Sequence, residues 1–147
     1  MKKLVVLVAL AALLGGCSSA PKENVTSCKQ AMQGIEITSN FISDESGKVL
    51  RLEQSSTQEI PEDQIELAKE SLEAQKASST NMDGVTMEYT MNGNVITANV
   101  TYDLTKLSDD MLLQFGFVDD FKDENGNINI DKVTELYTTI GIECTAK

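Results

Sequence analysis

Histidine and tryptophan are absent from the sequence, and the missing histidine restricts the chemistry open to the protein. Without it the chain cannot form a Ser-His-Asp or Cys-His catalytic site, and it lacks the commonest zinc ligand. Basic residues are also scarce, since 12 lysines and arginines stand against 23 acidic residues. Such a negative chain disfavours electrostatic binding of nucleic acid or anionic lipid. We find no catalytic, metal-binding or nucleotide-binding motif, and therefore predict no enzyme activity, no cofactor and no nucleic-acid partner.

The first residues have the pattern of a secretory signal peptide. Lys2 and Lys3 precede an apolar run over residues 4–14, which matches the charged and apolar regions of such signals. The run is too short to cross a bilayer, because a membrane-spanning helix needs about 20 apolar residues. We therefore expect residues 1–16 to direct export and then to be removed.

Leu14-Gly15-Gly16-Cys17 follows the apolar run and is similar to a bacterial lipobox. In a lipobox the cysteine thiol receives a diacylglycerol before the signal is cut in front of it. The alternative is an ordinary signal peptide followed by an incidental cysteine. We predict lipidation of Cys17, palmitate included, and so a cell-membrane anchor on the extracytoplasmic face of the cell envelope.

Removal of residues 1–16 leaves 131 residues with a net charge of −13, because the only charged residues of the signal are two lysines. This length supports one domain with a hydrophobic core but not two. The residues from Ser18 to Asn24 are mostly small and polar, as in a flexible linker. We predict a lipidated tether over residues 17–27 and a single, monomeric domain over residues 28–147.

Cys28 and Cys144 remain as a pair once Cys17 is assigned to lipid. An even pair in an exported protein is usually a disulfide. A redox-active pair would normally be closely spaced, as in Cys-x-x-Cys. We therefore predict a structural bridge that joins the two ends of the domain.

The first half of the domain shows strand patterns followed by one helix. Residues 34–42 and 48–57 have period-two patterns with a turn cluster between them, and residues 28–31 fit a first short strand. Ile65, Ala68 and Leu72 then recur at helical spacing. This spacing predicts a helix over residues 62–76.

Residues 85–104 carry the clearest local signal. Apolar and polar residues alternate on both sides of Asn92-Gly93, and a two-residue turn there would pair Tyr89 with Ile96. Every apolar side chain then lies on one face, so the pattern and the turn chemistry agree. The sequence predicts a β-hairpin.

Two short helices and a strand complete the chain. Ser108 is placed to cap a helix that ends near Gly116, and Asn129 to cap a helix that ends at Gly141. Residues 142–145 then form a last strand. The predicted fold class is α+β, with an antiparallel sheet of about five to six strands packed against two or three helices.

Two features of residues 115–124 invite a functional interpretation. Phe115, Phe117 and Phe121 suggest either core or the apolar lip of a ligand site, and we favour core. Four acidic residues nearby suggest calcium, but the EF-hand spacing fails, because it would place Phe121 and Lys132 at ligand positions. We favour a solvated acidic turn and predict no metal. The four residues are Asp119, Asp120, Asp123 and Glu124.

The polar side of the predicted hairpin offers a candidate binding face. Arg51 is the chain's single arginine, and it points to this side if Leu50 and Leu52 point inward. The alternative is an ordinary solvated sheet face, which is common in antiparallel sheets. The candidate binding residues are Arg51, Glu88, Thr90 and Thr97, beside Thr86, Asn99 and Thr101.

The order of these features resembles the YehR-like lipoproteins, small exported bacterial proteins with a domain of unknown function. The matching parts are the lipobox at Cys17, GIEIT at 34–38, QSSTQEIP at 54–61, the hairpin at 85–104 and DKVTELYTTIGIEC at 131–144. The resemblance spans nearly the whole mature chain and implies an α+β domain. It implies no established activity and no functional residues.

Two classes of function remain open. We expect a lipid-anchored, non-catalytic binding or interaction module whose protein or small-ligand partner the sequence does not identify. The alternative is a carboxylate-dependent hydrolase of the cell envelope, which would need two carboxylates at a fixed separation in a cleft.

Overall fold

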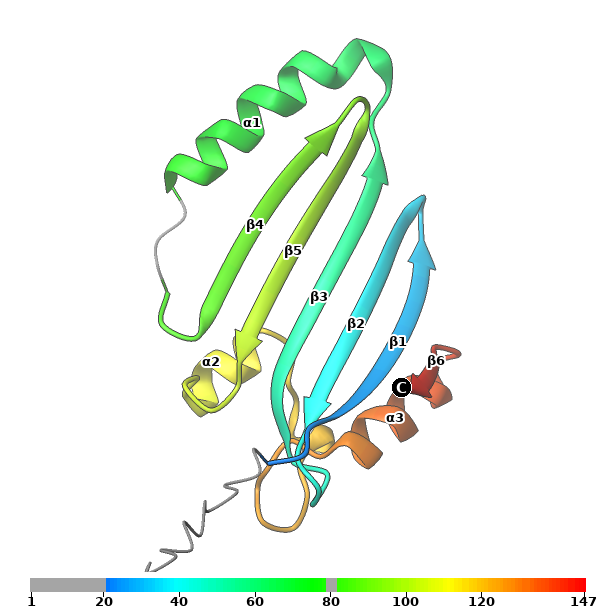
Figure 1. Cartoon of the computed structure of the whole chain (residues 1–147), viewed down its shortest axis with the longest axis vertical. Coiled ribbons are helices and arrows are strands. Elements are labelled where there is room, and N and C mark those ends of the chain that lie inside the picture. The colour runs from blue at the N-terminus through cyan, green and yellow to red at the C-terminus, as the bar shows by residue number, and fades with distance from the viewer. Residues whose placement is uncertain (1–20, 79–81) are drawn as a thin grey trace, which may run out of the picture.

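A computed structural model describes residues 21–78 and 82–147 of the chain, as a sheet with helices at one end and along one side (Figure 1). The predicted signal peptide and Cys17 lie outside the described residues. The six strands have the order β4-β5-β3-β2-β1-β6, and every neighbouring pair is antiparallel. The strands are β1 Asn24–Met32, β2 Ile35–Ser43, β3 Val49–Glu59, β4 Val85–Asn92, β5 Val95–Asp103 and β6 Glu143–Ala146. The helices are η1 Glu62–Gln64, α1 Ile65–Ser78, α2 Asp109–Gln114, η2 Asp119–Phe121 and α3 Ile130–Thr139. The predicted α+β fold class is confirmed.

The core lies at one end of one sheet face, where α2, η2 and α3 pack. Ring contacts run without a break from Phe115 through Tyr102, Phe117, Phe121 and Tyr137 to Phe41, with centroids 5.0–6.5 Å apart. These separations are those of favourable aromatic pairs. The phenylalanine cluster is therefore core, as predicted. We call this side the helix-covered face.

The folded domain begins earlier than the sequence predicted. Residues 28–31 were expected to form a short strand, whereas β1 starts at Asn24 and pairs along β2 from Asn24↔Ser43 to Met32↔Ile35. The predicted tether over 17–27 is thus wrong at its end, because residues 24–27 belong to the sheet. Small and polar residues before Cys28 suggested a linker, but the backbone groups of residues 24–27 pair with β2 like those of the rest of β1. Glu23 is the last residue before β1.

The hairpin is confirmed, but its turn lies one residue later than expected. Gly93 and Asn94 form the two-residue loop, so Tyr89 pairs with Ala98 and not with Ile96. Gly93 has φ +63°, and Asn94 has no positive φ, as in type II′ turns, whose first central residue is glycine. The register differs by two residues, so the apolar side chains still share one face.

The predicted helix over 62–76 is present as η1 followed by α1. Its contribution to packing is small, since no residue from 65 to 77 is buried. The strand that α1 contacts most is β4, at the outer edge of the sheet. Figure 1 shows α1 starting above the β4–β5 turn and running outside β4.

The C-terminal elements match the sequence closely. The Ser108 hydroxyl accepts a hydrogen bond from Met111 N, and Asn129 Oδ1 accepts one from Asp131 N, so both predicted caps are confirmed. Cys28 and Cys144 lie directly opposite each other on β1 and β6 and form the predicted disulfide.

We expect Gly93→Val to lower the free energy of unfolding by about 1 kcal/mol or more, because a β-branched residue is strained at positive φ. Steric crowding by neighbouring residues does not contribute to this loss, since a Cβ at Gly93 would meet nothing within 4 Å. Asn94→Ala is the matched control and should cost less. Urea melts measure both, and equal losses would show that the turn is built differently.

Loss of the disulfide should destabilise the domain by about 4–5 kcal/mol, because the bridge closes a loop of 116 residues in the unfolded chain. The variant is Cys28→Ala/Cys144→Ala, compared with the oxidised protein in denaturant melts. Intact mass after alkylation without reduction provides the check. Two alkylated thiols in that sample would contradict the bridge.

Candidate functional site

The predicted binding residues lie on the sheet face opposite the core, which we call the polar face. The register places Thr90, Thr97 and Thr57 in one row across β4, β5 and β3. Glu88 lies in the next row and is exposed, as is Thr90. Arg51 shares the face but lies six residues from Thr57 along β3, a distance of about 20 Å at 3.3 Å per residue. The structure therefore separates Arg51 from the other three.

Arg51 is held by two carboxylates of the chain itself. Its Nε lies 3.0 Å from Glu53 Oε1, and its Nη2 lies 3.4 Å from Glu23 Oε2. The hydrogen bond to Glu53 raises the pKa of Arg51, and the charge of Glu23 adds to the effect. Glu23 is the residue just before β1, so Arg51 fixes the point at which the chain enters the sheet.

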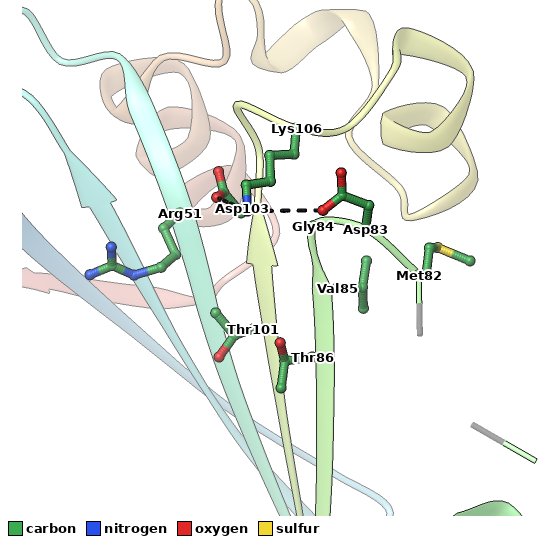
Figure 2. Close-up of a pocket in the computed structure, with 9 residues that line it drawn as sticks. All are labelled: Arg51, Met82, Asp83, Gly84, Val85, Thr86, Thr101, Asp103 and Lys106. Atoms are coloured by element: carbon green, nitrogen blue, oxygen red, sulfur yellow. Dashed lines mark ion pairs between the residues drawn. The ribbon is translucent and has the colours of Figure 1, made fainter. Parts of the chain in front are cut away.

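A hollow of about 540 Å³ lies at the lower end of the polar face, beside the start of β4 (Figure 2). Lys106 is its central cation, with Nζ 3.7 Å from Asp103 Oδ2 and 3.9 Å from Asp83 Oδ1. Both separations exceed hydrogen-bond length, so the ammonium keeps donors for a ligand. The lining residues are Arg51, Met82, Asp83, Gly84, Val85, Thr86, Thr101, Asp103 and Lys106.

Thr86 and Thr101 provide hydroxyls directly opposite each other on β4 and β5. The guanidinium of Arg51 points away from Lys106 and Asp83, toward the far side of β3 (Figure 2). The hollow is thus built mainly from one ammonium, two carboxylates and two hydroxyls. Such a set binds polar groups through hydrogen bonds and offers no ring for stacking.

Asp103 is a poor proton donor. Hydrogen bonding from the Thr105 hydroxyl lowers the pKa of Asp103, and the Lys106 charge lowers it further. Asp83 is 89% exposed in its side chain. Among the described residues no aspartate or glutamate is buried.

Sequence reasoning missed Asp83 and Lys106, which flank the hairpin and lie 23 positions apart. The register of the hairpin places these two residues near each other, because Asp103 N donates a hydrogen bond to Gly84 O and so brings the two ends of the hairpin together. Gly84, at φ +86°, packs so closely that an added Cβ would lie 3.0 Å from Leu107 Cδ2. The turn before β4 and the turn after β5 are therefore held against each other.

Asp119 and Asp123, in the acidic turn after α2, have partners within the chain. Asp123 Oδ1 accepts hydrogen bonds from the amides of Asn125 and Asn127. Asp119 Oδ1 lies 2.9 Å from Lys122 Nζ. In the described part of the chain no three acidic, cysteine or histidine residues gather as a metal-binding group.

Two solved structures are similar to this chain. An NMR structure of the E. coli YehR protein is 22% identical, covers 85% of this chain and 92% of that one, and has a TM-score of 0.65. An NMR structure of a protein from Streptococcus pneumoniae TIGR4 is 14% identical, covers 99% and 97%, and has a TM-score of 0.61. The predicted resemblance to YehR-like proteins is confirmed at the level of the fold.

No protein-family model matches the chain. No curated protein matches it either. Over the described ranges, none of the helices combines the length and apolarity needed to cross a membrane.

Proposed function

We propose that the protein is an extracytoplasmic lipoprotein of the YehR-like kind, held at the cell membrane by lipid on Cys17. The lipobox supports the anchor, and the fold likeness supports the family. The seven residues from Cys17 to Glu23 span at most about 25 Å when extended. Because Glu23 pairs with Arg51, the polar hollow lies at the tethered end, within reach of the membrane surface.

We further propose that the domain is a monomeric, non-catalytic module that binds a polar partner at this hollow and along the polar face. The observation that carries this proposal is that Lys106, paired with Asp103 and Asp83 at distances beyond hydrogen-bond length, lines the same hollow as Thr86 and Thr101. Neutral hydrogen bonds contribute about 0.5–1.5 kcal/mol each and those to charged groups about 1.5–3 kcal/mol, so one bond from Lys106 and two from the hydroxyls contribute about 2.5–6 kcal/mol, the range of millimolar binding. The hollow selects for hydroxyl, amide or mixed-charge groups.

The alternative, a carboxylate-dependent hydrolase, has less support. Such an enzyme needs a general acid whose pKa is raised by burial. Asp103, the most enclosed carboxylate of the hollow, has its pKa lowered. A lowered pKa suits a permanent anion that orients Lys106, and it does not suit a proton donor.

Lipidation is expected to depend on Cys17. Growth with an alkyne fatty acid should label the wild-type protein and leave Cys17→Ser unlabelled and released from membranes. Cys28→Ser provides a second thiol variant, which should keep the label if it is exported. Equal labelling of the wild type and Cys17→Ser would contradict the anchor.

Binding at the hollow is expected to depend on Lys106. A photo-crosslinking amino acid at Thr86 should capture a partner in intact cells, and Lys106→Ala should reduce the yield by about tenfold, the loss for one charged hydrogen bond. Lys69→Ala, on α1, is the matched lysine control, and a crosslinker at Glu135, on α3, is the matched position. Equal capture from Thr86 and Glu135, or no effect of Lys106→Ala, would assign the polar face to ordinary solvated sheet.

A further inference from the structure

β1 extends further than the edge strand that pairs with it. β6 pairs with β1 only as far as Lys29, whereas β1 continues to Met32. Lys147 N donates to Val25 O, and the bonds of an antiparallel ladder alternate, so the odd-numbered residues of β1 face β6. The first of these beyond the end of β6 is Ala31, which is exposed. On that side its N–H and C=O have no strand partner within residues 21–78 and 82–147.

The end of α3 keeps β6 from extending as far as Ala31. Gly141 N donates to Thr138 O, and Ile142 N donates to Tyr137 O. These are the two bonds of a Schellman motif, which closes the last turn of a helix. The amides just before β6 are therefore bonded to the helix and not to β1.

A hollow of about 650 Å³ lies between the end of β1 and the turn that joins α3 to β6. It is lined by residues 29–32 and residues 140–143, so the free backbone groups of Ala31 border open space. Figure 1 shows the end of β1 as the outermost part of the sheet on this side, while α1 lies along the opposite edge. The volume is within the usual range of ligand sites, about 300–1,000 Å³. We call this space the β1 hollow.

The side chains of the β1 hollow combine apolar surface with one cation. Met32 is 60% exposed and Ile140 is 64% exposed, and in the described part of the chain only Leu67 exceeds them among large apolar side chains. Lys29 and Glu143 lie opposite each other on β1 and β6. Lys29 forms no ion pair with any residue that the structure describes, so its ammonium is available to a ligand.

These groups fit the carboxyl end of an extended peptide. A chain that pairs antiparallel to β1 at Ala31 continues the line of β6, but the position opposite Gln30 belongs to Ile142, which directly precedes the partner of Lys29. The added chain must therefore end opposite Ala31, and in the antiparallel direction the end that arrives there is the carboxyl end. Antiparallel pairs exchange two hydrogen bonds between opposite residues, so the Ala31 N–H would donate to the terminal carboxylate.

We propose that the β1 hollow binds the free C-terminus of a partner peptide with an apolar penultimate residue. The last residue pairs with the backbone of Ala31, and its carboxylate receives the Ala31 N–H beside the ammonium of Lys29. The penultimate side chain lies opposite Met32 and covers Met32 and Ile140. The β1 hollow is at the other edge of the sheet from the polar hollow and does not depend on the function proposed for it.

The test uses a short labelled peptide that ends in Val-Ala with a free carboxylate, and the same peptide with a C-terminal amide. The protein is the exported Cys17→Ser form. Fluorescence anisotropy should show the acid peptide bound with a Kd below about 1 mM. The amide peptide should bind at least about tenfold more weakly, because it lacks the charge of the carboxylate. A peptide that ends in N-methyl-alanine cannot donate to Ala31 O and should also bind more weakly.

Two exposed side chains distinguish a carboxylate ligand from a cationic one. Lys29→Ala should weaken binding of the acid peptide by about tenfold. Glu143→Gln removes a like charge and should strengthen it by several-fold. Lys69→Ala, on α1, is the matched lysine control and should bind like the wild type. Thermal melts check that each variant is folded.

The peptide pair decides the proposal even if a variant fails to fold. Equal binding of the acid and amide peptides, or no binding of the acid peptide, would overturn it. Unchanged binding by folded Lys29→Ala would also overturn it. Weaker binding by Glu143→Gln would overturn it in favour of a cationic ligand.

Discussion

The sheet is longer than the helices that cover it, and the rest of the structure depends on this mismatch. Strands of nine to eleven residues extend about 30–36 Å, whereas α3, with ten residues, extends about 15 Å. The sequence of β3 marks where the cover stops. Leu52 is buried beneath the helices, but Gln54, Ser56 and Gln58 follow on the same face. The far half of the sheet is therefore built to meet water or a partner on both faces.

Local patterns were enough to predict α1, α2, α3, both caps and every strand except the first half of β1, which begins at Asn24. Period-two alternation identified the hairpin, yet it could not fix the turn, because Asn92-Gly93 and Gly93-Asn94 give registers that differ by two residues and leave every side chain on its face. Helical spacing identified α1 but not its surroundings. Its apolar positions predicted a core-facing helix, and the structure leaves them half-buried beside an edge strand.

The candidate site depends on contacts between residues that lie far apart in the sequence. Arg51 stood out as a lone guanidinium, and its partners, Glu53 and Glu23, become visible only when β1 is known to begin at Asn24. Exposed ion pairs of this kind contribute about 0–1 kcal/mol, so Arg51 matters for geometry more than for stability. It fixes the point at which the chain enters β1. Lys106 and Asp83 were missed because they lie in turns, where sequence patterns carry no periodic signal.

The two edges of the sheet differ in how far they can accept another strand. β6 has four residues and is joined to β1 by the disulfide, so this edge is short and covalently fixed. β4 has eight residues and no covalent constraint. α1 runs outside β4 (Figure 1), and Glu88 adds a negative charge to this edge. A covering helix and a charge both oppose pairing between copies of a protein. The two edges are therefore protected in different ways, one by its short length and its disulfide and the other by a helix and a charge.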